Sequence, residues 1–275
     1  MSANLPAPRP RALSIAGSDS GGGAGIQADL KTFTVLGVFG MTAITAVTVQ
    51  NTNGVTGSEA LSSKIVGDQI RAVATDIGVD AAKTGMLANR EIVEAVADAV
   101  EQTRIPKLVV DPVLVSKHGH ALLAEDAVEA LKLRILPLAV LVTPNLSEAS
   151  ALAGFPVEGR DDMRRAADAI LSLGAVAVLV KGGHLKQPTE ASDLLVVGGI
   201  EQWIEAEWID TPNTHGTGCT LSAAITSHLA MGQGVVEAVR AAKMFVTEAI
   251  RHSLAIGAGI GPVDQLWSIR PGSAE

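Results

Sequence analysis

The chain has 275 residues, a formal net charge of −8, 47% hydrophobic residues and 18% charged residues. This length and composition suffice for one large α/β domain, or two small ones, with a sizeable core. Basic residues do not cluster in runs, which argues against nucleic acid as the main partner. No apolar run approaches the roughly 18 residues that a membrane span needs, so we expect no membrane partner. The single cysteine, Cys219, excludes an internal disulfide and favours a cytoplasmic location.

Residues 1–11 contain three prolines and lack the apolar core of a signal peptide, so we expect a flexible N-terminal tail. No repeat or linker divides the rest, and residues 12–275 are expected to form one domain. In chain order, the patterns predict a strand at 12–16, a helix at 24–36, a strand at 41–49, a helix at 62–77, a strand beginning at 81–83, a helix at 90–102, a strand at 108–110, a helix at 124–136, a strand at 140–142, a helix at 160–173, a strand at 177–180, a hairpin of 194–197 and 201–208, a helix after Gly218 and a helix at 235–253.

This alternation of strand and helix predicts a three-layer α/β/α sandwich with a mostly parallel central sheet. Ligands of such sheets bind at the carboxyl ends of the strands. The expected strand ends carry glycine, lysine, acidic and amide residues, namely Gly17-Ser18-Asp19, Gln50-Asn51, Lys83-Thr84-Gly85, Asp111, Asn145 and Lys181-Gly182-Gly183. We therefore expect the functional site at this edge of the sheet.

Residues 211–222 (TPNTHGTGCTLS) join a loop containing proline and glycine to the start of a helix. At such a junction the backbone N–H groups and the helix dipole are suited to an anion, or to charge that develops during a reaction. Cys219 lies at the start of this helix, where a thiol can have a lowered pKa. The alternative is a tight turn with a small buried cysteine.

Residues 17–25 are a further glycine-rich segment, and a helix follows directly. The glycines allow a ligand to approach the backbone closely, and a flexible turn is the alternative. The spacing Gly23-x-Gly25-x-x-Ala28 matches the loose dinucleotide fingerprint, which keeps a dinucleotide-dependent oxidoreductase as an alternative function. No acidic residue stands at the end of the following strand to hold the ribose, which counts against that function.

Asp111 and Glu148 are acidic residues near two successive strand ends. With Asn145 they could hold Mg²⁺, directly or through water, together with phosphate oxygens. Alternatively, Asn145 caps a helix beginning near Leu146, with Glu148 in its first turn, and both can be true.

Lys181, followed by Gly182-Gly183-His184, is a candidate for contact with nucleotide phosphates, and a solvated loop lysine is the alternative. The histidines show no metal-ligand spacing, so we assign no zinc site.

Several motifs together identify the chain as similar to a known family. They are Ile15-Ala16-Gly17-Ser18-Asp19, the run from Gly22 to Phe33 (GGAGIQADLKTF), Ile44-Thr45-Ala46, Gln50-Asn51-Thr52, Lys83-Thr84-Gly85-Met86-Leu87, Asp111-Pro112-Val113, Thr143-Pro144-Asn145-Leu146-x-Glu148, Val180-Lys181-Gly182-Gly183-His184 and the run from Asn213 to Ser222 (NTHGTGCTLS). In this order they resemble the hydroxymethylpyrimidine/phosphomethylpyrimidine kinases of thiamine biosynthesis, which belong to the ribokinase-like superfamily. The resemblance covers roughly Ala12 to Trp267 and implies a ribokinase-like fold.

Two positions indicate how this chain compares with particular branches of the superfamily. Many relatives have Asp where this chain has Cys219, whereas the pyrimidine kinases have Cys, so the cysteine favours that branch. Asp19-Ser20-Gly21 stands where the family is expected to have Asp-Pro-Ser or a similar sequence, which is a small departure in a loop.

The resemblance implies an enzyme that phosphorylates 4-amino-5-hydroxymethyl-2-methylpyrimidine with ATP and then converts the monophosphate to the diphosphate. It implies that Gln50 holds the pyrimidine, a role suited to an amide that both accepts and donates. The other implied positions are the substrate pocket at Gly17, Asp29, Met86 and Val113, the anion hole at Gly216, Thr217 and Gly218 with Cys219 as catalytic base, the ATP contacts at Asn145, Lys181, Gly182, His215 and Lys243, and the Mg²⁺ contacts at Asp111 and Glu148.

The resemblance also implies a homodimer, because relatives are commonly dimers. The nearest alternative function is a pyridoxal or pyridoxine kinase of the same superfamily, since the pyridine and pyrimidine alcohols are alike in shape. A non-catalytic regulator that binds a pyrimidine is a further alternative, and the complete anion-hole motif argues against it.

Overall fold

The computed structural model describes residues 9–114, 125–183 and 190–269, so His184 and residues 1–8 of the tail expected at 1–11 lie outside the described residues. The strands are β1 (Arg11–Ser18), β2 (Phe39–Asn51), β3 (Gly54–Ala60), β4 (Ala81–Thr84), β5 (Leu108–Val110), β6 (Ala139–Val142), β7 (Ala177–Val180), β8 (Glu190–Val197) and β9 (Ile200–Glu207). The helices are α1 (Gly25–Val35), α2 (Ser63–Asp76), α3 (Arg90–Thr103), α4 (Glu125–Ala130), α5 (Leu146–Ala153), α6 (Arg160–Leu171), α7 (Thr217–Ala230) and α8 (Val235–Arg251).

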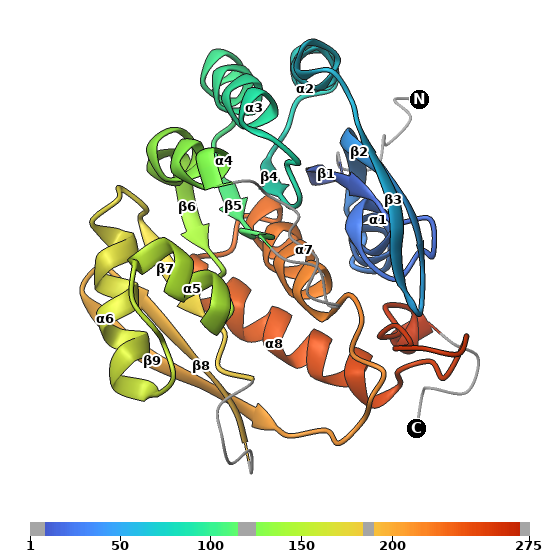
Figure 1. Cartoon of the computed structure of the whole chain (residues 1–275), viewed down its shortest axis with the longest axis vertical. Coiled ribbons are helices and arrows are strands. Elements are labelled where there is room, and N and C mark those ends of the chain that lie inside the picture. The colour runs from blue at the N-terminus through green and yellow to red at the C-terminus, as the bar shows by residue number, and fades with distance from the viewer. Residues whose placement is uncertain (1–8, 115–124, 184–189, 270–275) are drawn as a thin grey trace, which may run out of the picture.

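A nine-stranded sheet in the order β3-β2-β1-β4-β5-β6-β7-β8-β9 runs through the centre of the described structure. The strands from β2 to β7 in this order are parallel to one another. At the two edges, β3 pairs antiparallel with β2, and the hairpin of β8 and β9 pairs antiparallel with β7. The predicted mostly parallel sheet with helices on both faces is confirmed (Figure 1).

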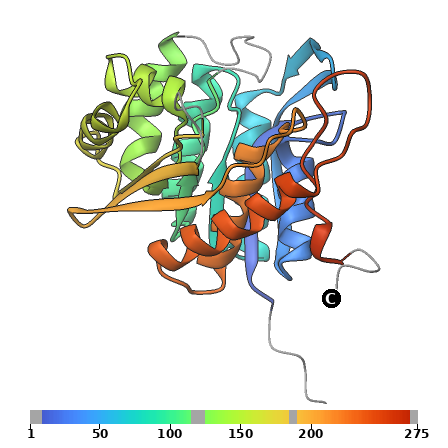
Figure 2. The same ribbon diagram turned by 90° about the horizontal axis from the view of Figure 1, so that it is seen from below.

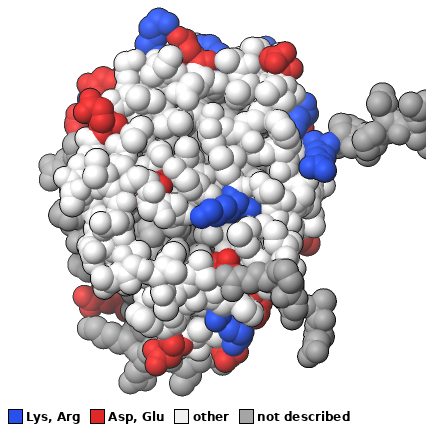
Figure 3. All heavy atoms as spheres, turned by 90° about the vertical axis from the view of Figure 1, so that its right-hand side faces the viewer, with Lys and Arg blue, Asp and Glu red and all other residues white. Residues whose placement is uncertain are grey.

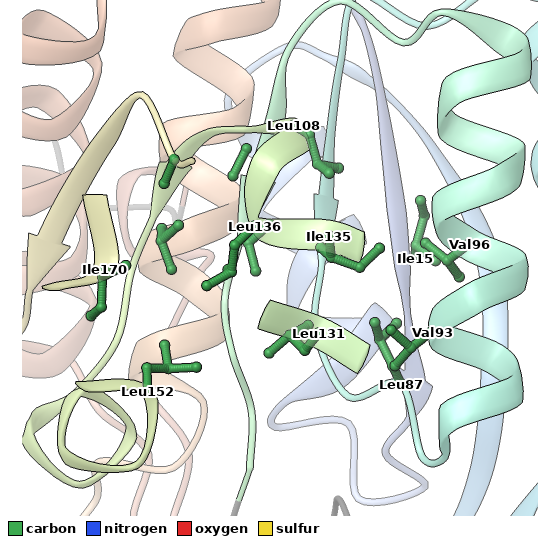
Figure 4. Close-up of a cluster of buried hydrophobic side chains, with 14 of the residues drawn as sticks. Ile15, Leu87, Val93, Val96, Leu108, Leu131, Ile135, Leu136, Leu152 and Ile170 are labelled. Atoms are coloured by element: carbon green, nitrogen blue, oxygen red, sulfur yellow. The ribbon is translucent and has the colours of Figure 1, made fainter. Parts of the chain in front are cut away.

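Successive residues of each strand face opposite helical layers, as the period of two requires. Val110 packs in the larger core with the helices from α2 to α6, whereas Val109 packs with α7 and α8. Figures 1 and 2 show these two groups of helices on opposite sides of the sheet. Side chains of the larger core meet in Figure 4, where Ile15 of β1 lies beside Val93 and Val96 of α3. Burial on both faces explains why the central strands are almost wholly apolar.

Two elements differ from the predictions. β3 was not expected, because its sequence GVTGSEA has two glycines and little apolar character. The helix predicted at 124–136 is α4 followed by a wider π turn at Leu131–Ile135 and a 3₁₀ turn at Leu136–Leu138. Pro137 explains this ending, because proline supplies no N–H for a further α-helical turn.

Residues after α8 return along the carboxyl edge of the sheet and tie together two loops. The N–H of Ile260 donates to the carbonyl of Thr52 beyond β2, at 2.9 Å. The N–H of His215 donates to the carbonyl of Gly261 at 3.1 Å, and the N–H of Val263 donates to the carbonyl of His215 at 3.0 Å. The loop before α7 is thereby fixed beside the end of β2. Within the described residues, no helix is both long and apolar enough to cross a membrane.

Candidate active site

The loop before α7 brings backbone groups against two charged side chains. Gly216 has a φ of +82°, and a side chain there would collide with the carbonyl oxygen of Gly23. A Cβ atom placed on Gly218 would lie 3.4 Å from Lys181 Nζ and 3.8 Å from Asp111 Oδ2. No described side chain caps α7, whose first residue is Thr217. The Thr217 N–H donates to the Thr214 carbonyl at 3.4 Å, and the N–H groups that follow it at this helix start are suited to an anion.

Cys219 is partly buried in the first turn of α7, and its thiol is not acidic. Burial raises the pKa of Cys219 to about 11, and the charges of Asp29 and Asp111 act in the same direction. The Lys83 ammonium and the N–H of Gly25 favour the thiolate without offsetting the effect of burial. The expectation of a lowered pKa at this helix start is therefore wrong, because desolvation of the thiol outweighs the favourable charges around it.

Lys181 follows β7 and lies between two carboxylates. Its Nζ is 3.0 Å from Asp111 Oδ1 and 3.9 Å from Glu148 Oε2. Burial alone would lower the pKa of Lys181, but these acids raise it. Burial raises the pKa of Glu148 to about 7, against the opposing effect of Lys181. At neutral pH the lysine is therefore charged and Glu148 is close to its titration midpoint.

Asp111 is buried at the end of β5, and each of its oxygens has polar partners. Thr143 Oγ1 lies 3.2 Å from Asp111 Oδ1, and Ser222 Oγ lies 3.2 Å from Oδ2. Burial would raise the pKa of Asp111, but Lys181 and Lys83 lower it, so the carboxylate is ionised. Among the described residues, no three His, Cys, Asp or Glu side chains are grouped to hold a metal ion. A cation here would need ligands besides the protein carboxylates.

Asn145 and Glu148 form a capping box at the start of α5. The Glu148 N–H donates to Asn145 Oδ1 at 2.9 Å, and the Asn145 N–H donates to Glu148 Oε2 at 2.7 Å. The capping role considered for these residues is confirmed. It leaves one oxygen of Glu148 outside the box, so the capping role does not exclude a ligand role.

Lys243 of α8 is anchored through an acid that was not singled out from the sequence. Lys243 Nζ lies 2.6 Å from Asp193 Oδ2, and Asp193 Oδ1 accepts from the N–H of Gly182 at 2.9 Å. Asp193 thus connects the helix to the loop after β7. Lys243 also lines a groove of about 640 Å³ between β9 and α8, where Glu205 and Met244 lie on the walls. A buried acid in the apolar strand β8 is the signal that could have identified Asp193.

Asp19 organises the glycine-rich loop after β1. Its Oδ1 accepts from the N–H of Gly21 at 2.8 Å, and its Oδ2 accepts from the N–H groups of Gly23 at 3.1 Å and Ala24 at 2.8 Å. His215 Nε2 lies 3.0 Å from the same Oδ2. Burial would raise the pKa of Asp19, but the bonds from His215, Ala24 and Gly21 lower it. The loop is therefore held in one conformation, and it is not a merely flexible turn.

Gln50, at the end of β2, lies beside this loop. Its side-chain amide nitrogen is 3.3 Å from His215 Nε2, and Ser20 Oγ donates to its backbone carbonyl at 2.9 Å. The ring of His215 is therefore on the expected substrate side of the site, and its assignment to ATP stays a prediction. The three side chains of Asp19, Gln50 and His215 meet although His215 lies far from the others in sequence.

Asp29 and Lys83 form an ion pair with both side chains 0% exposed. Lys83 Nζ lies 2.8 Å from Asp29 Oδ1 and 3.0 Å from Oδ2, and Ser14 Oγ also donates to Asp29. Burial raises the pKa of Asp29 against the effect of Lys83. Asp29 is the fifth residue of α1, so it does not serve the helix dipole in the first turn. Its predicted contact with substrate is a proposal that requires this buried pair to become accessible.

The remaining predicted pocket residues lie near the end of β1 and the end of β5. Met86 packs so closely on Gly17 that a side chain at Gly17 would meet its Cε atom. Thr45 Oγ1 fixes the segment by donating to the Met86 carbonyl at 2.6 Å. Val113 turns back over Asp111, because its N–H donates to the Asp111 carbonyl at 2.9 Å.

Comparison with known proteins identifies the family of this chain. The phosphomethylpyrimidine kinase family model matches residues 19–264. The hydroxymethylpyrimidine/phosphomethylpyrimidine kinase of Streptomyces coelicolor is 52% identical over 264 residues, covering 96% of this chain and 97% of that protein. The ADP complex of Bacillus subtilis pyridoxal kinase is similar with a TM-score of 0.88 and 42% identity, over 94% of this chain and 98% of that chain.

A phosphomethylpyrimidine kinase from Clostridium difficile is similar with a TM-score of 0.78 and 46% identity, over 87% of this chain and 99% of that chain. The family model matches most of the chain, and the identity with the Streptomyces coelicolor protein extends over nearly the full length of both chains. The chain belongs to the phosphomethylpyrimidine kinase family.

Proposed function

We propose that the chain is an ATP-dependent kinase of thiamine biosynthesis. It phosphorylates 4-amino-5-hydroxymethyl-2-methylpyrimidine and then converts the monophosphate to the diphosphate. The observation that carries the proposal is Gly218, whose backbone lies against Lys181 and Asp111 at the start of an uncapped helix. Such a site stabilises the charge of a phosphoryl group in transit.

The nucleotide lies along the carboxyl edge of the sheet, from the anion hole toward α8. Lys181 and the N–H groups of the anion hole face its phosphates, with Asn145 and Gly182 beside them. Lys243 marks the far end, since it lines the groove between β9 and α8. We assign the nucleotide base to this groove. Asp193 bonds to both Lys243 and Gly182 and so fixes α8 next to the loop after β7. This connection between the phosphate side and the groove supports the assignment.

We assign Mg²⁺ to the acidic side of this site, with water molecules and phosphate oxygens as ligands. Asp111 is ionised, but its oxygens already have Lys181, Thr143 and Ser222 as partners. Glu148 has one oxygen outside its capping box. Asp111 and Glu148 would therefore hold the hydrated ion, which supplies positive charge to the phosphates.

Cys219 accepts the proton of the substrate hydroxyl as that oxygen attacks the γ-phosphate. Because its pKa is about 11, only a small thiolate fraction is present at neutral pH. The N–H groups of the loop therefore supply the larger share of catalysis, as phosphoryl transfer mainly requires positioning and charge stabilisation. In the second phosphorylation the attacking phosphate oxygen is already ionised, and the need for a base falls.

We propose a homodimer that forms through the face over β2 and β3. The space-filling view of this side shows mostly uncharged residues (Figure 3). Val47 and Val49 of β2 are 46% and 65% exposed, and β3 is an edge strand with one charged residue, Glu59. Exposed apolar side chains beside an unpaired sheet edge are normally covered. A second copy suits this face, because two uncharged surfaces avoid the repulsion expected between chains of net charge −8.

A mass-spectrometric time course with ATP, Mg²⁺ and the pyrimidine alcohol tests the function. The monophosphate should appear first and the diphosphate later. The likeness to Bacillus subtilis pyridoxal kinase makes pyridoxal the necessary rival substrate. A higher kcat/KM for pyridoxal would assign that function instead. Binding of NAD(P) would favour an oxidoreductase, and absence of ATP turnover would favour a non-catalytic regulator. A cytoplasmic location is part of the proposal.

A further inference from the structure

His215, Asp19, Gln50 and Thr48 form a connected set of polar groups beside the expected pyrimidine pocket. His215 Nε2 lies 3.0 Å from Asp19 Oδ2 and 3.3 Å from the amide nitrogen of Gln50. The amide oxygen of Gln50 lies 3.1 Å from Thr48 Oγ1, and Thr48 Oγ1 lies 2.9 Å from the carbonyl oxygen of Ser18. The donors and acceptors of this set can be assigned by counting hydrogens.

The first assignment is the hydrogen on His215 Nε2. Asp19 accepts from the backbone N–H groups of Gly21, Gly23 and Ala24, which keeps its carboxylate ionised. An ionised carboxylate only accepts hydrogen bonds. An imidazole nitrogen without hydrogen would place its lone pair against that carboxylate at 3.0 Å. Nε2 therefore carries a hydrogen and donates it to Asp19.

The second assignment is the rotation of the Gln50 amide. An amide N–H₂ group cannot donate to a ring nitrogen that itself carries a hydrogen. A half-turn of the amide exchanges its oxygen and nitrogen without moving other atoms. It places the oxygen against His215 Nε2–H, whose one hydrogen is then shared between Asp19 Oδ2 at 3.0 Å and the amide oxygen, and it places the amide nitrogen against Thr48 Oγ1. The Thr48 hydroxyl accepts from that nitrogen, because its own hydrogen is directed to the Ser18 carbonyl at 2.9 Å.

We propose that His215 and Thr48 lock the Gln50 amide in this one orientation and thereby determine which heteroaromatic edge the pocket accepts. One lone pair of the amide oxygen and one N–H remain for the ligand, in a fixed order. That order matches an exocyclic amine beside a ring nitrogen, as in the aminopyrimidine of the proposed function on which this inference rests. His215 and Thr48 are specificity-determining residues that act through Gln50.

The 4-oxo analogue of the pyrimidine alcohol is the matched probe. Its N3–H tautomer presents an acceptor and a donor in the reverse order. To bind it, Gln50 must turn back and place its N–H₂ group against the His215 N–H. An unpaired buried polar group costs enough to reduce kcat/KM by roughly 10- to 100-fold. Wild-type protein should prefer the amino substrate by at least that factor.

His215→Ala and Thr48→Val each remove one side of the lock. In both variants the ratio of kcat/KM for the amino over the oxo substrate should fall by about tenfold or more. His252→Ala, which replaces an exposed histidine at the end of α8, should leave the ratio unchanged. If His215→Ala is inactive with both substrates, the ratio of kcat/KM values measured for Thr48→Val still tests the proposal. An unchanged ratio in folded Thr48→Val overturns the proposal.

¹⁵N NMR of the histidine side chains tests the lock without any substrate. The His215 signals are assigned by their loss in His215→Ala. The expected result is a protonated Nε2 in His215 at neutral pH. An Nε2 without hydrogen overturns the inference whatever the enzyme phosphorylates. If the wild-type protein does not phosphorylate the aminopyrimidine although Nε2 carries a hydrogen, the proposed function is wrong. The role of His215 and Thr48 in substrate specificity is then wrong as well, whereas the assigned hydrogen positions still hold.

Discussion

At the residue scale, the environment of Cys219 governs its chemistry more strongly than its place at a helix start does. Because the pKa of Cys219 is raised to about 11, the thiolate fraction should grow about tenfold per pH unit up to that value. Alkylation by iodoacetamide should therefore be slow at neutral pH and should accelerate steadily from about pH 8 to about pH 10. A cysteine peptide, whose rate levels off near its ordinary pKa of about 8.5, is the control. A rate for Cys219 that already levels off near neutral pH would show an acidic thiol and contradict the effect of burial.

Gln50 is the residue whose proposed role can be separated most cleanly from the nucleotide site. Gln50→Ala should weaken binding of the pyrimidine by roughly 1–3 kcal/mol, because polar groups in the pocket lose their partner. The affinity for ATP should hardly change, because Gln50 lies near the end of β2, whereas the proposed nucleotide contacts Lys181 and Lys243 lie after β7 and on α8. Isothermal titration with each ligand measures both effects. Equal losses for the two ligands would make Gln50 a structural residue.

At the element scale, substitution of the two glycines at the start of α7, Gly216 and Gly218, should have different consequences. Gly216→Val should mainly destabilise the fold, because φ is +82° and the side chain meets the Gly23 carbonyl. Gly218→Val should mainly abolish turnover, because the added Cβ atom would lie 3.4 Å from Lys181 Nζ and 3.8 Å from Asp111 Oδ2. Thermal melting and kcat of both variants give the comparison. Normal turnover in Gly218→Val would remove this loop from the mechanism.

The elements themselves were largely predictable from the sequence, because apolar periodicity reports burial directly. Parallel strands end at one edge, so Asp111, Asn145 and Lys181 could be expected to meet there. β3 escaped prediction because its exposed edge position does not require apolar residues. Side-chain partners were not predictable in the same way. The pairs of Asp19 with His215 and of Asp193 with Lys243 join segments that are distant in sequence. Apolar periodicity indicates which face of an element is buried, but it does not indicate which distant residue that face contacts.

The pKa of Cys219 shows the same limit at a single residue. A helix start favours a thiolate in general, and this expectation used only the local sequence. The structure adds burial, and it adds Asp29 and Asp111 as nearby negative charges. These contributions come from α1 and β5, so they depend on the tertiary fold.

At the scale of the whole molecule, the proposed dimer face can be tested with one charge. Val49→Glu should yield monomers in light scattering after size-exclusion chromatography, because two buried carboxylates would face the interface. Leu133→Glu is the matched control, since Leu133 is 71% exposed on the turn after α4, away from β2 and β3. A wild-type monomer, or a dimer that persists in Val49→Glu, would contradict the proposed face.

The molecule is proposed to run two phosphorylations at one anion hole, with the thiol required for only one of them. A neutral alcohol must lose a proton as it attacks, whereas the phosphate of the monophosphate is already ionised. Cys219→Asp should retain part of the first activity, because a carboxylate can also accept the proton. Cys219→Ala cannot accept it.

The most direct test compares the rates of Cys219→Ala starting from the alcohol and from the monophosphate, with ATP and Mg²⁺ in excess. The first phosphorylation should slow by about 10²- to 10⁴-fold, as expected for loss of a general base. The second should slow much less. Equal slowing of both steps would contradict the account, because Cys219 would then only shape the anion hole and the proton would leave by another route.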